Sequence, residues 1–295
     1  MNADGFAIRC GPKAVALETT LLLHGVPHES CMGLAAELEA DVRSSGAEPA
    51  LIGVVAGVPT VGMTHAELAL MRDAESVPKA NTSNLGVLIA RKSHAATTVS
   101  TTMEIAAVAG VKVFATGGLG GVHQGWATHL DISTDLFALT RFPVAVVASG
   151  VKSLLDIPAT REALETLGVP VIGVGTDRFP AFYLRHSDAK VDARIDDVQE
   201  LARFVNSEIK RTGRGVLIAH PIPEEHEIDA HAFERWLMQA RKHAEEHGAK
   251  GRDVTPAILG ALHLISGGAT LRANIALVRA NARLAGRLRA AMEVA

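Results

Sequence analysis

The stretch that decides the fold lies at residues 144–152, which read Val144-Ala145-Val146-Val147-Ala148-Ser149-Gly150-Val151-Lys152. Its first five residues form an apolar run with the length of a buried strand, and a small polar turn follows at once. Runs of the same kind recur along the chain, at Ala14–Leu17, Ala50–Val55, Val111–Ala115, Val169–Val174 and Val216–Ala219. We therefore expect a sheet of six or so short, buried strands.

Helical patterns lie between these runs. The capping box Thr64-His65-Ala66-Glu67 predicts a helix over Thr64–Arg72, and two more helices are predicted at Met32–Ser44 and Thr160–Leu167. This alternation predicts an α/β fold, with a largely parallel sheet flanked by helices on both faces (α/β/α). The C-terminal third is different, because three consecutive amphipathic helices are predicted there, at Asp229–Glu246, Pro256–Ile265 and Leu271–Ala290.

Length and composition favour one folded unit and exclude several classes of partner. The 295 residues are 48% hydrophobic and contain no Pro/Ser-rich linker or repeat, so we expect a single domain over residues 1–295. A net charge of −3 argues against a nucleic-acid partner. We expect no membrane span, because no apolar run approaches the roughly 20 residues required. Two cysteines without a CxxC motif, and no visible export signal, favour the cytoplasm.

Ligands of open α/β sheets bind beyond the carboxyl ends of the strands, and polar residues gather there in this chain. Glu18 follows the first strand, Thr116 and the glycine cluster 117–121 follow the strand at Val111, and Lys152 follows the strand at Val144. The glycine cluster either lets the backbone approach a phosphate or carbonyl, or only forms a tight turn.

Two further segments carry hydroxyl and carboxylate groups. Residues 97–102, which include Thr98, precede the helical run Met103–Ala109 and indicate either an anion site or a plain N-cap. Residues 131–135 offer either oxygen ligands for a divalent cation or a helix N-cap, and a cap is the favoured interpretation for Asp135.

Three charged residues indicate covalent chemistry. Lys152 precedes two leucines, so its amine is expected in a partly desolvated pocket where it can act as a neutral nucleophile; otherwise it is an ordinary solvated lysine. Glu18 is either a general acid/base or the partner of a salt bridge. Lys79 would repel the charge of Lys152 if the two converge.

These segments resemble the pseudouridine-5′-phosphate glycosidase family, from Val15 to about Ala282. The matching strings are Val15–Thr20 with His24-Gly25, Ala96–Val99, Phe114–His123, Asp131–Leu136, Lys152–Asp156, Pro180–Phe182, Pro221–Glu224 and Asn274-Ile275. The resemblance implies an α/β/α fold, a homotrimer and a divalent cation, usually manganese.

Transferred by position, the family's roles make Lys152 the nucleophile and Glu18 the proton donor and acceptor. Lys79 falls on a sugar-contacting lysine, and Asp131 on the metal position. The other substrate-binding positions are Val99, Ser133, Thr134, Asp135, His123 and Asn274, to which the strand-end and hydroxyl patterns add Thr98 and Thr116. The implied chemistry is a lysine imine at C1 of a ribose phosphate.

The chain also departs from the family's usual strings. Residues 80–84 replace Ser-Arg-Arg-Asp, Gln124-Gly125-Trp126-Ala127 replaces Arg-Gly-Ala-Glu, and His220 replaces the asparagine of Asn-Pro-Ile-Pro. Charged groups are thus exchanged for neutral and aromatic ones, with Trp126 expected to stack on the ring that is joined to the sugar, the aglycone. The pattern is similar to C-glycosynthases of antibiotic pathways, such as the alnumycin type, which join ribose 5-phosphate to an aromatic polyketide. This subtype is favoured over a pseudouridine-5′-phosphate glycosidase that releases uracil, and over a non-catalytic sugar-phosphate-binding protein.

Overall fold

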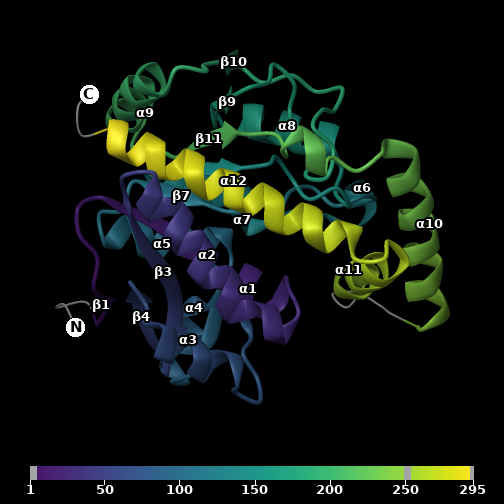
Figure 1. Ribbon diagram of the computed structural model, residues 1–295, viewed down its shortest axis with the longest axis horizontal. Coiled ribbons are helices and arrows are strands. Elements are labelled where there is room, and N and C mark those ends of the chain that lie inside the picture. Colours follow the sequence, from purple (N-terminus) through teal and green to yellow (C-terminus); the bar gives the residue numbers. More distant parts are fainter. Residues whose placement is uncertain (1–4, 249–253, 293–295) are drawn as a thin grey trace.

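The structure, a computed structural model, describes residues 5–248 and 254–292, and its strands form one sheet (Figure 1). The strand order along the sheet is β1-β4-β3-β2-β7-β8-β11-β9-β10, with β6 paired to β3 and β5 to β6. The strands are β1 (Ala7–Ile8), β2 (Ala14–Glu18), β3 (Glu48–Val55), β4 (Val58–Val61), β5 (Lys79–Ala80), β6 (Ala95–Thr97), β7 (Val113–Ala115), β8 (Ala145–Ala148), β9 (Val171–Gly173), β10 (Ala193–Arg194) and β11 (Val216–Ala219).

The predicted parallel sheet is confirmed. All pairs from β3 across to β10 are parallel, and only β4 and β6 run antiparallel to β3. Every residue of β2, β7, β8 and β11 is buried, because helices cover both faces of the sheet. The six predicted runs are all strands, with ends that differ by at most two residues from those expected from the sequence.

Helices form one layer on each face. The first layer contains α2 (Cys31–Ser44), α9 (Val198–Thr212) and α12 (Ala269–Ala291), and the second contains α5 (Val99–Val108), α7 (Thr134–Arg141) and α8 (Ile157–Thr166). The remaining helices are α1 (Thr20–His24), α3 (His65–Arg72), α4 (Leu85–Ala90), α6 (Trp126–His129), α10 (Ala230–Glu246) and α11 (Val254–Ile265). Two 3-10 turns, η1 (His28–Ser30) and η2 (Glu224–His226), complete the elements.

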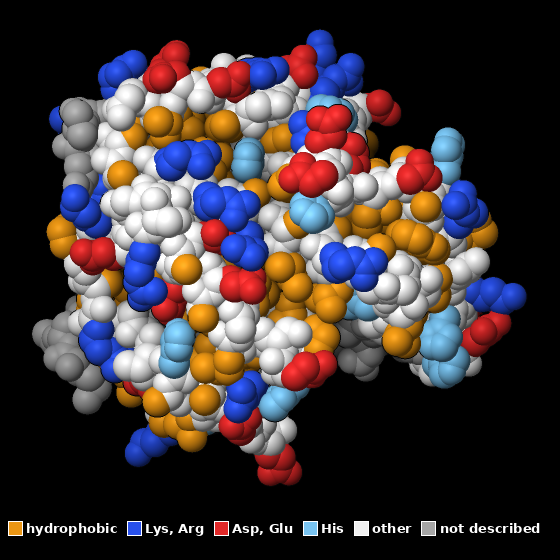
Figure 2. All heavy atoms as spheres, in the orientation of Figure 1, with side chains coloured by type: hydrophobic (Ala, Val, Ile, Leu, Met, Phe, Trp, Pro, Cys, Tyr) orange, Lys and Arg blue, Asp and Glu red, His pale blue; other side chains and the backbone are white. Residues whose placement is uncertain are grey.

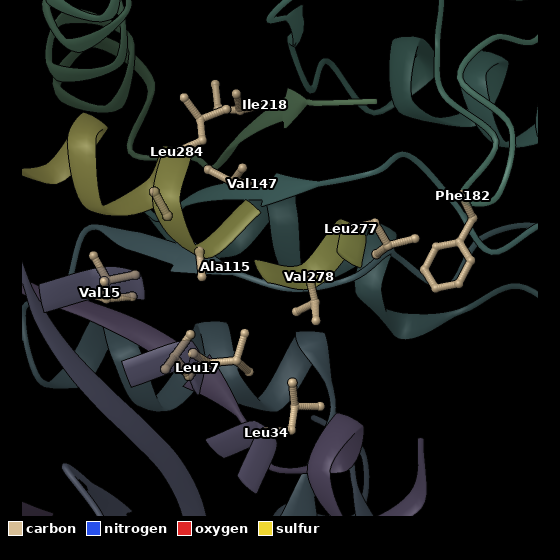
Figure 3. Close-up of a cluster of buried hydrophobic side chains, with 14 of the residues drawn as sticks. Val15, Leu17, Leu34, Ala115, Val147, Phe182, Ile218, Leu277, Val278 and Leu284 are labelled. Atoms are coloured by element: carbon tan, nitrogen blue, oxygen red, sulfur yellow. The ribbon is translucent and has the colours of Figure 1, made fainter. Parts of the chain in front are cut away.

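The C-terminal helix α12 crosses the strands β2, β7 and β8 and lies between α2 and α9 (Figure 1). Leu277, Val278 and Leu284 of α12 meet side chains of the sheet in the hydrophobic core (Figure 3). Figure 2 shows basic side chains over α12 with acidic ones beside them. Two arginines of α12 pair with α2: Arg279 Nε and Arg283 Nη1 lie 2.7 and 3.0 Å from the carboxylate of Asp41. Apolar burial and ion pairs together fix α12 across the sheet.

The predicted helices are present, but several begin earlier than predicted; α5, for example, begins at Val99, four residues before the predicted run Met103–Ala109. Thr64 and Glu67 form the expected capping box of α3, and the three C-terminal helices appear as α10, α11 and α12. Helix α8 begins at Ile157, three residues before the prediction, because the carboxylate of Asp156 accepts a hydrogen bond from Ala159 N at 3.0 Å. In the described part of the chain no single helix meets the length and apolarity needed to cross a membrane; Ala257–Ile265 and Ala269–Ala291 meet them only as a pair bent by 107°.

Candidate active site

Two adjoining cavities lie beyond the carboxyl ends of β2, β7 and β8, with volumes of about 350 and 340 Å³. We call the first the apolar cavity, after side chains such as Leu21, Val26, Phe182 and Tyr183, and the second the polar cavity, after the hydroxyl and carboxylate groups of residues 131–135. Both are lined by Glu18, Thr20, Lys79, Lys152, Leu154 and Leu259. All twelve residues predicted for the site line one cavity or both: Thr116 and Asn274 the apolar one, and Thr98, Val99, His123, Asp131, Ser133, Thr134 and Asp135 the polar one.

Glu18 ends β2 and is the buried acid of the site. Burial raises the pKa of its carboxyl to about 7, although the positive charge of Lys152 and a hydrogen bond from Thr116 Oγ1 act in the opposite direction. A carboxyl that is half protonated near neutral pH can both take and give a proton. The geometry therefore suits the acid/base role expected for Glu18.

The two lysines of the site converge, since both line the two cavities and their charges interact. Partial desolvation lowers the pKa of Lys79, and the positive charge of Lys152 lowers it further. Lys152 itself is exposed towards the cavities, so the partly desolvated pocket expected for its amine is not present in this single chain. Its backbone is fixed by a hydrogen bond of 3.1 Å from Lys152 N to the carbonyl of Leu119.

The polar cavity contains an anion that belongs to the protein itself. The carboxylate of Asp135 accepts hydrogen bonds from Ser100 N, at the start of α5, and from Gly120 N, at 2.9 and 2.8 Å. These donors are thus not free for a ligand, contrary to a simple anion site at residues 97–102. The cap of α7 is Ser133, whose Oγ accepts from Asp135 N at 3.2 Å, so the expected capping role of Asp135 is wrong.

Hydroxyl groups line the rest of the polar cavity. Thr98 Oγ1 lies 3.2 Å from Ser100 Oγ, which lies 3.1 Å from Thr134 Oγ1. Groups of this kind can each donate and accept, which suits the hydroxyls and phosphate of a sugar phosphate.

The glycine cluster is required by packing. A Cβ on Gly118 would lie 2.6 Å from the ring of Phe182, and one on Gly121 would lie 2.5 Å from Thr160 Oγ1. Phe182 has a φ of 65°, a strained conformation for a residue with a side chain, and it directs the ring at this turn. Packing therefore accounts for these two glycines, and the approach of this backbone to a ligand stays a prediction, since Gly117 and Gly118 line the apolar cavity and Gly120 the polar one.

Asp131 and His123 could hold part of a cation's coordination shell. Asp131 Oδ2 lies 3.6 Å from His123 Nδ1, and the Asp131 side chain is 65% exposed. The described residues contain no group of three or more His, Cys, Asp or Glu side chains that could hold a metal by themselves. The pair fits a cation such as Mn²⁺ or Mg²⁺ only if water and a substrate phosphate supply the other oxygens.

The aromatic replacement Trp126 lies outside the site. Its side chain is 40% exposed on α6, and it lines neither cavity. Gln124 lines neither cavity either, and its amide nitrogen lies 3.5 Å from the carbonyl of Leu155. The expected stacking of the aglycone on Trp126 is therefore wrong.

His220, another replacement, connects to the site indirectly. Its Nδ1 lies 3.0 Å from Oδ1 of Asn281, whose Nδ2 donates to the carbonyl of Thr116 at 2.8 Å. Because Nδ2 occupies the donor side of the amide, His220 Nδ1 must be the donor to Oδ1. The pKa of His220 is lowered, mainly by burial, so the ring is held neutral.

Sequence reasoning missed the second wall of the apolar cavity. His24, Tyr183, Leu259 and His263 line it, although they come from separate parts of the chain. Only His24-Gly25, which stands in a matching string, carried a signal that could have found one of them.

The comparisons with known proteins agree with this geometry. Residues 6–291 match the model of the family described as indigoidine synthase A like protein. The chain belongs to this family. It is 46% identical over 280 residues to a pseudouridine-5′-phosphate glycosidase of Nocardioides sp., covering 94% of this chain and 91% of that protein. It is also 46% identical over 276 residues to a pseudouridine-5′-phosphate glycosidase of Solibacter usitatus, covering 93% and 92%.

Among solved structures, the crystal structure of the prealnumycin C-glycosynthase AlnA in complex with ribulose 5-phosphate is similar to this one. The TM-score is 0.88 at 36% identity, and the match covers 96% of this chain and 92% of that one. These similarities confirm the resemblance drawn from the sequence. They also confirm the expected class of this indigoidine synthase A-like protein, an enzyme that makes or breaks a C-glycosidic bond.

Proposed function

We propose that this enzyme makes or breaks the bond between C1 of ribose 5-phosphate and a ring carbon of a planar aglycone, through an imine on Lys152. The observation that carries the proposal is the position of Lys152, Lys79 and Glu18 in the wall that both cavities share. A nucleophile at this place reaches a sugar phosphate in the polar cavity and an aglycone in the apolar one.

In the synthetic direction, the amine of Lys152 in its unprotonated form adds to the C1 aldehyde of the open sugar. The Glu18 carboxylic acid supplies one proton as water leaves, so that a protonated imine and the Glu18 carboxylate remain. A ring carbon of the aglycone then attacks C1, and the C=N electron pair moves to the Lys152 nitrogen. The Glu18 carboxylate takes the proton that the ring carbon loses. The 4-hydroxyl oxygen of the sugar then displaces the Lys152 nitrogen from C1, and Glu18 returns its proton to that nitrogen. The hydroxyl proton passes to Glu18, and the ribose ring is closed. Cleavage is the reverse sequence.

A divalent cation held by Asp131 beside His123, manganese by the family resemblance, would supply positive charge to the phosphate. The phosphate would also meet the hydroxyls of Ser133 and Thr134 in the polar cavity.

The favoured subtype is a C-glycosynthase that attaches ribose 5-phosphate to an aromatic polyketide in antibiotic biosynthesis. The apolar lining of the first cavity supports it, since a flat polycyclic ring gains about 25 cal/mol for each Å² of apolar surface it buries. The similarity to the prealnumycin C-glycosynthase points the same way. The second candidate is a pseudouridine-5′-phosphate glycosidase that releases uracil, which the relatives at 46% identity favour.

The proposal extends to a homotrimer in the cytoplasm. Leu130 and Phe137 are 74% and 56% exposed and lie near Ile132 and Trp126 in sequence, so residues 126–137 offer apolar surface for a subunit contact. Light scattering tests the trimer, and Leu130→Asp is expected to dissociate it.

Borohydride trapping tests the chemistry. Incubation with ribose 5-phosphate and borohydride is expected to add a pentose phosphate to the peptide that contains Lys152, and mass spectrometry detects it. The adduct disappears in Lys152→Ala and remains in Lys79→Ala. An adduct on Lys79 alone would contradict the assignment. Turnover with pseudouridine 5′-phosphate but with no polycyclic acceptor would decide for the glycosidase.

A further inference from the structure

Helix α11 forms one wall of the apolar cavity, through Leu259, Gly260 and His263. His263 brings the one ionisable side chain among these three. Its Nδ1 lies 2.7 Å from Thr270 Oγ1 at the start of α12, and Thr270 is itself buried and lies 3.0 Å from Ser266 Oγ. The ring is therefore fixed in orientation, and within the described part of the chain Nε2 is the ring nitrogen available to a ligand.

The protonation state of His263 follows from its surroundings. Burial lowers the pKa of the ring, so the imidazole is neutral at ordinary pH. Thr270 can accept from Nδ1 or donate to it, and Nε2 is correspondingly an acceptor or a donor. The other imidazole of this cavity, His24, is already hydrogen bonded to the backbone of Val77.

A second polar group of the cavity lacks a protein partner. Asn274 is 6% exposed, lines the apolar cavity, and its Oδ1 has no hydrogen bond within the described residues. This oxygen is itself inaccessible to solvent. The cavity thus combines apolar walls with hydrogen-bonding groups, and His263 is among them. Its volume of about 350 Å³ lies in the range of about 300–1,000 Å³ typical of small-molecule sites.

We propose that His263 is a specificity-determining residue, which selects a hydroxyl-bearing aromatic aglycone by a hydrogen bond between its Nε2 and the ring hydroxyl. This inference rests on the proposed function, because it takes the apolar cavity as the aglycone site. The apolar walls bind the ring without regard to its substituents. The imidazole, fixed by Thr270, then distinguishes a phenol from the bare hydrocarbon.

The test compares binding of 2-naphthol and naphthalene by the full-length protein in its ribose 5-phosphate complex. Wild type is expected to bind 2-naphthol about two- to thirteenfold more tightly, the effect of one hydrogen bond of about 0.5–1.5 kcal/mol. His263→Phe keeps a ring of similar shape without the nitrogen and is expected to lose this preference. The matched control is Leu264→Ala on the same helix, where the side chain is 81% exposed, and it is expected to keep it.

Borohydride trapping of ribose 5-phosphate on each variant distinguishes a failure of the role of His263 from a failure of the proposed imine chemistry. His263→Phe is expected to trap the sugar as wild type does, which also shows that the variant is folded. An unchanged preference for 2-naphthol in His263→Phe, or no preference in wild type, would overturn the role of His263. Absence of trapping in wild type would reject the proposed chemistry, and the naphthol comparison without sugar would still decide the binding role.

Discussion

The hydroxyl of Thr116 donates a hydrogen bond to the buried carboxylate of Glu18. Thr116 stands directly after β7 and Glu18 ends the neighbouring strand β2, so the contact joins two strand ends. The carbonyl of Thr116 is held in turn by Asn281 of α12. The protonation of the candidate acid/base therefore depends on the hydroxyl of a residue on the neighbouring strand end.

Removing this hydroxyl is expected to raise the pKa of Glu18. The hydrogen bond stabilises the carboxylate form, so Thr116→Val moves the pKa above its value of about 7. A bond to a charged group is worth about 1.5–3 kcal/mol, which corresponds to a rise of about 1–2 pH units in the midpoint of the pH–rate profile. Thr116→Ser, which keeps the hydroxyl, is the control. A midpoint that stays in place in Thr116→Val would show that the bond does not set this pKa.

Glu18→Gln is expected to stabilise the fold while it lowers activity. The folded-state pKa is raised from 4.5 to about 7, so the favourable contribution of Glu18 is complete below about pH 4.5 and is lost as pH rises through 7. A pKa shift of about 2.5 units corresponds to about 3 kcal/mol of folding stability, and the Glu18→Gln variant does not lose it because glutamine does not ionise. Thermal unfolding from pH 4.5 to 9 should show that the stability of the variant relative to wild type increases as pH rises. Its turnover is expected to fall by about 100-fold or more.

Asp135→Asn is expected to lower stability. The carboxylate accepts from Ser100 N and Gly120 N, and an amide can turn its oxygen to only one of them. The backbone donor left unpaired costs about 1–3 kcal/mol, measurable by urea unfolding. Ser133→Ala is the comparison, because it removes only the cap of α7. Unchanged stability in Asp135→Asn would mean that water replaces the lost acceptor.

Removal of divalent cations is expected to weaken sugar-phosphate binding. The Asp131 carboxylate with His123 provides too few ligands by itself, so cation and phosphate should bind together. Titration of ribose 5-phosphate by calorimetry, with Mn²⁺ and after chelation, measures this coupling. Paramagnetic broadening of the phosphate ³¹P signal gives a second readout. Asp131→Ala should lose both effects, and a variant that kept them would place the cation elsewhere.

The parts of the site that could be predicted are those governed by strand order. Glu18, Thr116 and Lys152 each follow an apolar run, and the ends of parallel strands necessarily meet at one edge of the sheet. The C-terminal helices could be predicted from their periodicity, but their placement could not. His263 reaches the site only because α11 and α12 fold back over the strand ends, a tertiary arrangement without a local signal.

The surroundings of individual side chains could not be predicted from the sequence either. Trp126 was expected in the aglycone site because it replaces a family residue, yet a one-turn helix turns it to the surface. The anion partner of the α5 N-terminus is Asp135, 35 residues further along the chain, and no pattern linked the two. The single domain over residues 1–295 stays a prediction, for which one cooperative calorimetric transition is the expected result.

Helix α12 follows every strand of the sheet in the sequence, and this order has a consequence for how the enzyme is made. A growing chain on the ribosome carries Lys152 and Glu18 long before Asn274 and Asn281 are synthesised. Without α12, the carbonyl of Thr116 has no amide to hold it, and the apolar cavity lacks a wall. Lys152 and Glu18 are thus enclosed in a complete site only after α12 has been synthesised and has packed on the sheet.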